Sequence, residues 1–94
     1  MRIVGIIWLR DIVEKLEEKH HVSQTEVEEV FLGHPRVRRI ERGDVAGEDL
    51  YSALGRTEDG RCLVIFFIHK RSDDVLIVSA RDMGPRERKH YGKK

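Results

Sequence analysis

Residues 62–68 read Cys-Leu-Val-Ile-Phe-Phe-Ile, the longest uninterrupted apolar run in the chain. A strand with one face in solvent alternates polar and apolar residues, whereas this run does not alternate. It therefore predicts a central strand over Arg61–Lys70 that is covered on both faces. Seven residues are too few to cross a bilayer. Cys62, inside the run, is expected to act as a small apolar side chain and not as a nucleophile.

Turn signals flank this run and separate it from further strands. Thr57–Gly60 predicts a turn in which Gly60 takes the left-handed position that closes a hairpin, and Arg71–Asp74 predicts another turn. The sequence accordingly predicts one strand before the run, at Leu50–Arg56, and one after it, at Val75–Ala80.

An arginine-rich segment earlier in the chain also has the period of a strand. It predicts a short strand in which Val37 and Ile40 point inward while the arginines stay in solvent, namely Arg36, Arg38, Arg39 and Arg42. A polar loop, Gly43–Asp49, leads from it to the next strand.

The N-terminal third predicts a strand and two helices. Arg2–Trp8 is rich in β-branched and large apolar residues, which favours a strand. A helix that ends near His20–His21 is predicted by an apolar stripe with helical spacing: Leu9, Ile12, Val13 and Leu16. Ser23 and Glu26 match a capping box that begins a second helix, and Gly33 ends that helix.

The C-terminal residues predict a short, highly charged helix at Arg86–Tyr91, because Pro85 is favoured in a first helical turn. The predicted order is β-α-α-β-β-β-β-α, an α+β fold in which an N-terminal strand and two helices pack on a mainly antiparallel sheet. A chain of 94 residues has room for one hydrophobic core, so residues 1–94 are expected to form a single domain.

Composition narrows the class of protein. Apolar residues make up 39% and charged residues 37%, which is too apolar for a disordered tail. The first nine residues lack the build of a signal peptide, so we expect a soluble, cytoplasmic protein with no membrane partner. A single cysteine excludes an intrachain disulfide and a cysteine-based zinc site.

Charge is distributed unevenly along the chain. The formal net charge is +1, yet residues 81–94 hold six Lys/Arg against two Asp/Glu. A basic end on an otherwise neutral domain indicates a partner that carries phosphate groups. The alternative is a solvated tail that keeps the protein soluble.

The basic end contains the candidate catalytic residues, which are Arg81, Glu87, Arg88 and Tyr91. The candidate substrate-binding residues are His69, Lys70, Arg71 and Arg86. This mixture suits cleavage of an RNA phosphodiester without a metal: guanidinium groups neutralise charge on the phosphorus oxygens, and a carboxylate, imidazole or phenol takes the proton from a 2′-OH. The alternative is that Glu87 pairs with Arg86 or Arg88 while Tyr91 packs on the sheet.

Neither a metal nor a cofactor is predicted. His20 and His21 are adjacent and point apart on a helix, and the remaining histidines are scattered along the sequence. No glycine-rich loop precedes a helix in the pattern that binds nucleotide phosphates.

The closing residues resemble the ending of a known family. Ser79-Ala80-Arg81, followed by Glu87-Arg88 and then Tyr91, is similar to the ending of the BrnT family of toxin ribonucleases. Weaker similarities lie upstream, at Glu48, Tyr51, Gly55, Gly60-Arg61 and Leu63-Val64, and at the front, at Trp8 and Lys19-His20.

The resemblance implies a RelE-like fold and a metal-independent endoribonuclease. It also implies a co-expressed antitoxin whose ribbon-helix-helix part binds operator DNA, so that DNA would be contacted only through the antitoxin. Carried over by position, the catalytic residues of this chain are expected to be Arg81, Glu87, Arg88 and Tyr91.

The chain departs from the family pattern at several positions. Leu50 and Leu76 stand where the family often has arginines, and losing them would weaken phosphate binding if both face the active surface. In the first helix, polar family residues are replaced by Leu9, Ile12 and Leu16, which look like core adjustments, and His21 replaces a glycine. These changes leave open a non-catalytic module of the same fold that binds RNA or protein.

Overall fold

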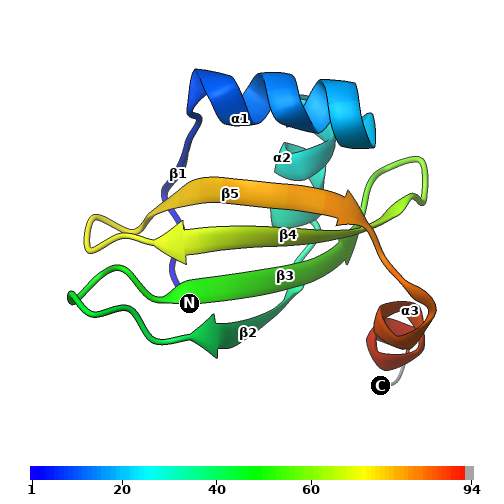
Figure 1. The fold of residues 1–94 in the computed structure, drawn as a ribbon. Helices are drawn as coiled ribbons and strands as arrows, with labels where there is room; N and C mark the ends of the chain where they lie inside the picture. Colours follow the sequence, from blue (N-terminus) through cyan, green and yellow to red (C-terminus); the bar gives the residue numbers. More distant parts are fainter. Residues whose placement is uncertain (93–94) are drawn as a thin grey trace.

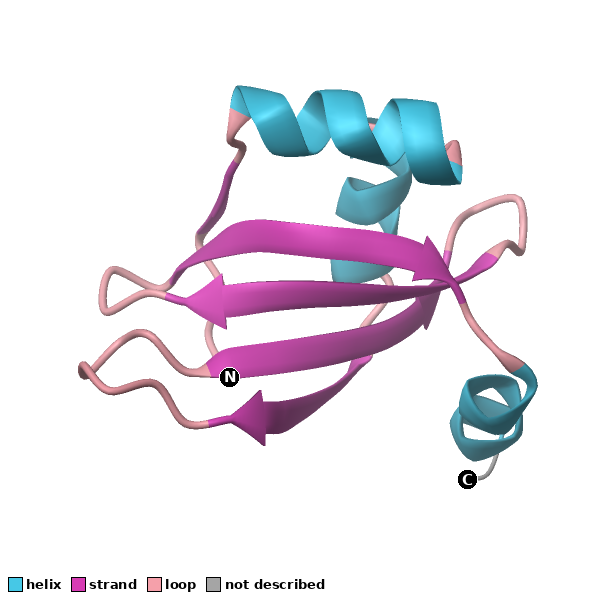
Figure 2. Cartoon of the chain, viewed as in Figure 1, coloured by secondary structure: helices cyan, strands magenta, loops and turns pink. Residues whose placement is uncertain are grey.

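The computed structural model of the protein describes residues 1–92, which form one five-stranded sheet with helices on both sides (Figures 1 and 2). The elements in chain order are β1 Gly5–Ile7, α1 Arg10–Lys15, the π-helix η1 Leu16–His20, α2 Gln24–Leu32, β2 Arg36–Glu41, β3 Leu50–Arg56, β4 Cys62–His69, β5 Asp74–Asp82 and α3 Pro85–Gly92. The predicted α+β class is confirmed. None of the helices in this part of the chain is long and apolar enough to cross a membrane.

The strands lie in the order β1-β5-β4-β3-β2. β1 runs parallel to β5, and every other pairing is antiparallel. The apolar run of residues 62–68 is therefore the central strand, as predicted. Gly60 takes a left-handed conformation, with φ +87°, in the turn before it.

The main core fills the space between the sheet and the helices α1, η1 and α2 (Figure 1). Alternate residues of β4 point into it, and Leu63, Ile65 and Phe67 have no exposed surface. Gly55 on β3 lets α2 approach closely, because a Cβ atom there would lie 2.6 Å from Cγ1 of the buried Val30. The capping box predicted at Ser23 and Glu26 is present and fixes where α2 begins.

The opposite face of the sheet, called the open face below, is covered only in part. α3 packs over one end of it through a small cluster formed by Leu54, Val64, Met83 and Tyr91. On β4 only Val64 is fully buried on this side, whereas Phe66 and Ile68 stay partly exposed. The prediction that β4 is covered on both faces therefore holds only at the end where α3 lies.

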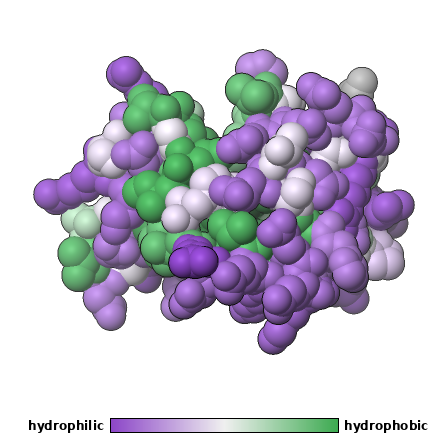
Figure 3. Space-filling model, turned by 90° about the horizontal axis from the view of Figure 1, so that it is seen from above, coloured by the Kyte–Doolittle hydropathy of each residue, from purple (hydrophilic) through white to green (hydrophobic). Residues whose placement is uncertain are grey.

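The N-terminal region differs from its prediction in three ways. β1 has three residues and not the whole of Arg2–Trp8. The first helix widens into a π-helix before it ends at His21, whose φ of 53° confirms that the histidines terminate it. Leu9 precedes the helix and is 50% exposed, so it adds no core area. Figure 3 shows much of the apolar surface of this side gathered toward the beginning of α1.

β2 is an edge strand, and its six residues are all exposed. Val37, paired with the core residue Ala53, points to the helix side of the sheet as predicted, but it is 37% exposed, and Ile40 is 44% exposed. Neither side chain is therefore buried in the core. The reason is that neither α1 nor α2 extends over this edge of the sheet, and a β-bulge between Arg39 and Glu41 changes the direction of the strand at Ile40.

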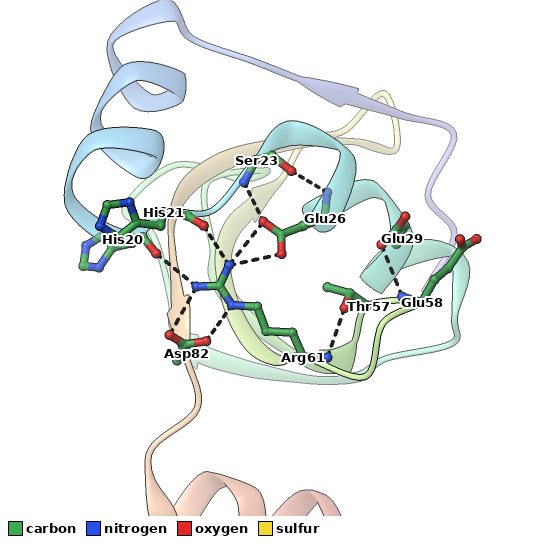
Figure 4. Close-up of polar contacts among 9 residues, drawn as sticks. All are labelled: His20, His21, Ser23, Glu26, Glu29, Thr57, Glu58, Arg61 and Asp82. Atoms are coloured by element: carbon green, nitrogen blue, oxygen red, sulfur yellow. Dashed lines mark hydrogen bonds and ion pairs between the residues drawn. The ribbon is translucent and has the colours of Figure 1, made fainter.

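The side chain of Arg61, just before β4, joins four segments of the chain (Figure 4). Its guanidinium group donates hydrogen bonds of 2.8 and 3.2 Å to the carboxylate of Asp82 at the end of β5, and of 3.1 and 3.2 Å to that of Glu26 on α2. It also donates to the carbonyl oxygens of His20 and His21, at 3.0 and 2.7 Å. These hydrogen bonds satisfy the end of the π-helix and hold the end of β5 beside α2.

Replacing Arg61 with alanine is expected to lower the free energy of unfolding by about 2 kcal/mol, because two carboxylates and two carbonyl groups lose a charged donor. Urea unfolding followed by circular dichroism measures the change. Arg10→Ala is the matched control, since Arg10 is 90% exposed and forms only a surface ion pair with Glu14. Equal losses in the two variants would contradict the role given to Arg61.

Candidate active site

α3 is fixed at the end of β5 by contacts that begin before the helix itself. The backbone N–H of Met83 donates to the carbonyl of Cys62 at 3.0 Å, and the Met83 side chain is buried. The N–H of Gly84 donates to Oε1 of Glu87 at 2.8 Å, so the carboxylate at the third helical position caps the start of α3. Tyr91, four residues after Glu87, packs against the sheet on the same side of the helix.

Arg81 and Glu87 form a two-pronged ion pair between β5 and α3. Nη1 and Nη2 of Arg81 donate to Oε1 and Oε2 of Glu87 at 2.7 and 2.9 Å. The guanidinium carbon lies 5.6 Å from the ring centre of Phe66, and Nη1 also donates to the carbonyl of Asp82 at 3.1 Å. Both side chains remain partly exposed, so the guanidinium group is held in one orientation at the surface of the open face.

This pairing sets the charge of both groups. Hydrogen bonds from Arg81 are the largest cause that lowers the pKa of the Glu87 carboxyl below its ordinary value of 4.5, and the N–H of Gly84 lowers the pKa further. The hydrogen bonds to Glu87 raise the pKa of Arg81 in return. Glu87 is therefore ionised at neutral pH and engaged with Arg81, which makes it a positioning group rather than a proton donor.

A groove with a volume of about 660 Å³ opens beside this pair, between β2 and α3. Its floor is formed by side chains of β3 and β4, including Ser52, Leu54, Val64 and Phe66. Its walls are formed by side chains at the two sides, including Arg36, Arg38 and Ile40 on β2 and Arg86, Glu87 and His90 on α3. The groove thus combines a largely apolar floor with basic walls.

The two walls are connected at one end, where Nη1 of Arg36 donates to the backbone carbonyl of His90 at 3.0 Å. Arg38 and Arg86 are exposed, and within residues 1–92 neither forms an ion pair. Guanidinium groups that are not engaged by carboxylates can bind phosphate oxygens through paired hydrogen bonds. The groove is therefore suited to an anionic chain.

The structure brings together three of the eight predicted site residues, namely Arg81, Glu87 and Arg86. Tyr91 is on the same helix as Glu87 and Arg86, but it packs against the cluster of Leu54, Val64 and Met83. Arg88 is exposed and lies near Asp82, where its charge adds to the lowering of the pKa of that carboxyl, after the larger effect of Arg61. The alternative in which Glu87 pairs with Arg86 or Arg88 is wrong, because Glu87 pairs with Arg81.

The other three predicted residues lie at the opposite end of the sheet. Arg81 is paired in register with Val64, whereas His69 is five residues further along β4, a distance of roughly 16 Å. There His69 contacts the backbone carbonyl of Arg2 and the carboxylate of Asp73, and Lys70 forms an ion pair with Glu48. His69, Lys70 and Arg71 therefore do not join the groove.

Three groove residues were missed by the sequence analysis: Arg36, Arg38 and His90. A signal for the first two was present, because residues two apart on a strand point to the same face. They were interpreted only as solvated residues of a strand, since nothing local shows that α3 lies opposite them. Among residues 1–92, no three His, Cys, Asp or Glu side chains gather in a way that could hold a metal ion.

Leu50 and Leu76, at the two positions where the sequence analysis expects family arginines, both face the open side of the sheet. Leu50 is paired with Ile68 on β4, and Ile68 is paired in turn with Leu76 on β5. The two leucines thus lie on the same face as Arg81, but at the end of the sheet away from α3. Neither leucine lines the groove, so arginines at these positions would bind phosphate on the open face only outside the groove.

The fold and the closing motif can now be compared with known proteins. A family model described as "Ribonuclease toxin, BrnT, of type II toxin-antitoxin system" matches residues 9–87. The chain therefore belongs to the BrnT family of ribonuclease toxins, and the resemblance seen in the sequence is confirmed. A ribonuclease toxin of a type II toxin-antitoxin system has RNA as its substrate and an antitoxin protein as its partner.

One solved structure extends the comparison to the fold. The chain is similar to the crystal structure of the Brucella abortus ribonuclease toxin BrnT, with a TM-score of 0.64 and 20% sequence identity. The superposition covers 86% of this chain and 97% of the Brucella chain, so the two share a fold over nearly their whole length. No curated protein sequence matched the chain.

Proposed function

We propose that this chain is an endoribonuclease toxin that cleaves RNA in the cytoplasm, without a metal, at the groove between β2 and α3. The observation that carries the proposal is the guanidinium group of Arg81, which Glu87 holds at 2.7 and 2.9 Å beside a groove whose walls bear further arginines. RNA is bound along the basic walls, and the phosphate to be cleaved lies next to Arg81.

The chemistry needs positive charge at the phosphate and a group that moves a proton. The 2′-oxygen gives its proton to the imidazole of His90, attacks the neighbouring phosphorus and expels the 5′-oxygen, which takes up a proton from water. The products are a 2′,3′-cyclic phosphate and a 5′-hydroxyl. Arg81 and Arg86 neutralise the charge that grows on the phosphoryl oxygens. His90 lines the groove, and its imidazole serves as the proton acceptor.

Incubating the purified chain with RNA in EDTA tests this function. Fragments that carry a 2′,3′-cyclic phosphate and a 5′-hydroxyl are expected, because arginine supplies the positive charge. A preparation of the Arg81→Ala variant, purified in parallel, controls for contaminating nucleases. RNA that stays intact at high protein excess contradicts the proposed function, and cleavage that needs added Mg²⁺ contradicts metal independence.

Replacing both Arg38 and Arg86 with alanine is expected to weaken RNA binding about tenfold or more at 0.15 M salt, because two phosphate contacts are lost. The slope of log affinity against log salt concentration should fall by about 0.7 per lost contact for single-stranded RNA. Filter binding or fluorescence anisotropy across a salt series measures both. Arg10→Ala, on the far helix, should change neither the affinity nor the slope.

A second candidate is a non-catalytic module that binds RNA or protein, and the aliphatic side chains of Leu50 and Leu76 on the open face favour it. This candidate predicts salt-sensitive RNA binding without cleavage, so the same EDTA experiment separates the two. In either case we propose that the partner is a ribbon-helix-helix antitoxin, through which alone the complex contacts DNA. An electrophoretic mobility shift with operator DNA, with and without the antitoxin, tests this.

A further inference from the structure

Four aliphatic side chains form a row across the open face. Ile7 on β1 is paired with Leu76 on β5, Leu76 with Ile68 on β4, and Ile68 with Leu50 on β3. Paired residues point to the same side of a sheet, and the residues that alternate with them, such as Val75, Ile77 and Phe67, are buried in the core on the helix side. The row therefore lies on the face opposite α1 and α2.

No element among residues 1–92 packs over this row. Its members belong to neither of the two hydrophobic clusters, and α3 lies at the other end of the strands (Figure 1). Ile7 is 38% exposed, and Leu50, Ile68 and Leu76 are partly exposed. Contiguous apolar side chains of this kind, across four strands, mark a surface that another molecule covers.

The row is aligned with the basic groove. Along β3 the open face presents Leu50, then Ser52, then Leu54, and Leu54 is paired with Arg36. Four residues of strand separate the aliphatic row from this last position, a distance of about 13 Å. A helix of about nine residues spans the same length. One short segment can therefore cover the aliphatic row at one end and reach Arg38 and Arg86 at the other.

We propose that the row of Ile7, Leu76, Ile68 and Leu50 is the docking site of an amphipathic segment of the antitoxin. The segment places aliphatic side chains on the row and carboxylates about 7 to 13 Å further along the strands, where Arg38, paired with Ser52, and Arg86 line the groove, and it thereby blocks the groove. RNA is not the occupant of the row, because aliphatic side chains offer it neither phosphate contacts nor aromatic stacking. The inference rests on the proposed function only for the identity of the partner.

The test measures the affinity of the chain for the antitoxin encoded beside its gene, by isothermal titration calorimetry at 0.15 M salt. The double variant Ile68→Thr/Leu76→Thr places threonine, which favours strands, at both positions but removes the centre of the row. Its Kd is expected to rise about 30-fold or more, as for the loss of a central apolar hot spot. Leu32→Thr is the control, because Leu32 is 81% exposed on α2, and its Kd should stay within threefold of the wild type.

A second measurement uses the wild-type chain and does not depend on how well the variant folds. On titration with the antitoxin, the methyl resonances of Ile7, Leu50, Ile68 and Leu76 should shift or broaden, whereas those of Leu32 should not. Unchanged methyl resonances in the row, or a Kd that the double variant leaves within threefold, would overturn the proposal. So would self-association of the isolated chain that the double variant abolishes, because a second copy would then be the occupant.

Failure of this proposal and failure of the proposed ribonuclease activity have different signatures. The calorimetric and methyl measurements contain no RNA, so they give the same answer whether or not the chain cleaves it. In a parallel cleavage assay without antitoxin, the double variant should keep its rate within threefold of the wild type. Loss of RNA binding in that variant, with antitoxin binding retained, would assign the row to RNA and overturn the proposal.

Discussion

Replacing Arg81 with alanine is expected to lower kcat/KM for RNA cleavage at least about a hundredfold and to leave the chain folded. The expected size of this decrease follows from the contribution of a single hydrogen-bond donor. One donor placed where negative charge develops in a transition state contributes about 10²- to 10³-fold to the rate. Arg81 is held in one orientation beside the groove by two hydrogen bonds to Glu87 and by its position near the ring of Phe66. A quenched fluorescent RNA oligonucleotide gives the rate.

Two further variants separate charge from geometry at this position. Arg81→Lys keeps the charge but cannot form the two-pronged pair with Glu87, so it should recover little of the activity. Arg88→Ala removes an exposed arginine of α3 that takes no part in the Arg81–Glu87 pair, and its rate should stay within about threefold of the wild type. Near-normal cleavage by Arg81→Ala, or loss of cleavage in Arg88→Ala, would move the active site away from the groove.

Replacing Phe67 with alanine is expected to cost about 4 kcal/mol of the free energy of unfolding, within the range measured for buried phenylalanines. Phe67 has no exposed surface, and its ring lies 5.3 Å from that of Phe31 and 5.7 Å from that of Tyr51. The cavity would open between α2 and the central strand. Because the total free energy of unfolding of a small domain is about 5–15 kcal/mol, the variant should unfold at much lower urea concentrations.

The neighbouring residue provides a matched control for this prediction. Phe66 has the same side chain on the same strand, but it points to the open face, where it is partly exposed. Phe66→Ala should therefore cost clearly less than Phe67→Ala in the same urea titration. Equal losses of unfolding free energy would mean that Phe66 is buried as fully as Phe67. The open face would then be covered.

Much of the fold could be predicted because its signals act over a few residues. The capping box at Ser23 and Glu26, the left-handed Gly60 and the strand Leu50–Arg56 all appear where the sequence placed them. The apolar run of residues 62–68 identified the central strand, because a strand with covered faces does not alternate polar and apolar residues. Its second face is covered only at the end where α3 lies. The closing motif from Ser79 to Tyr91 identified the family.

The site could be predicted only in part, because its geometry depends on contacts between distant residues. Arg81 and Glu87 are six residues apart, and both belong to the recognised motif. Arg36 and His90, in contrast, are 54 residues apart, and no local pattern shows that an edge strand and a C-terminal helix form the two walls of one groove. His69, Lys70 and Arg71 have basic side chains, as Arg81 does, and this made them candidates. The strand register places them at the other end of the sheet.

The sequence by itself determined the class of fold, the central strand, the helix that carries Glu87 and the basic character of the chain's end. The tertiary structure decided which basic groups face one another, and it left a row of aliphatic side chains uncovered on the same face. The physical reason is that periodicity and capping are set by neighbouring residues, whereas strand register and the docking of α3 are set by the packing of the whole core.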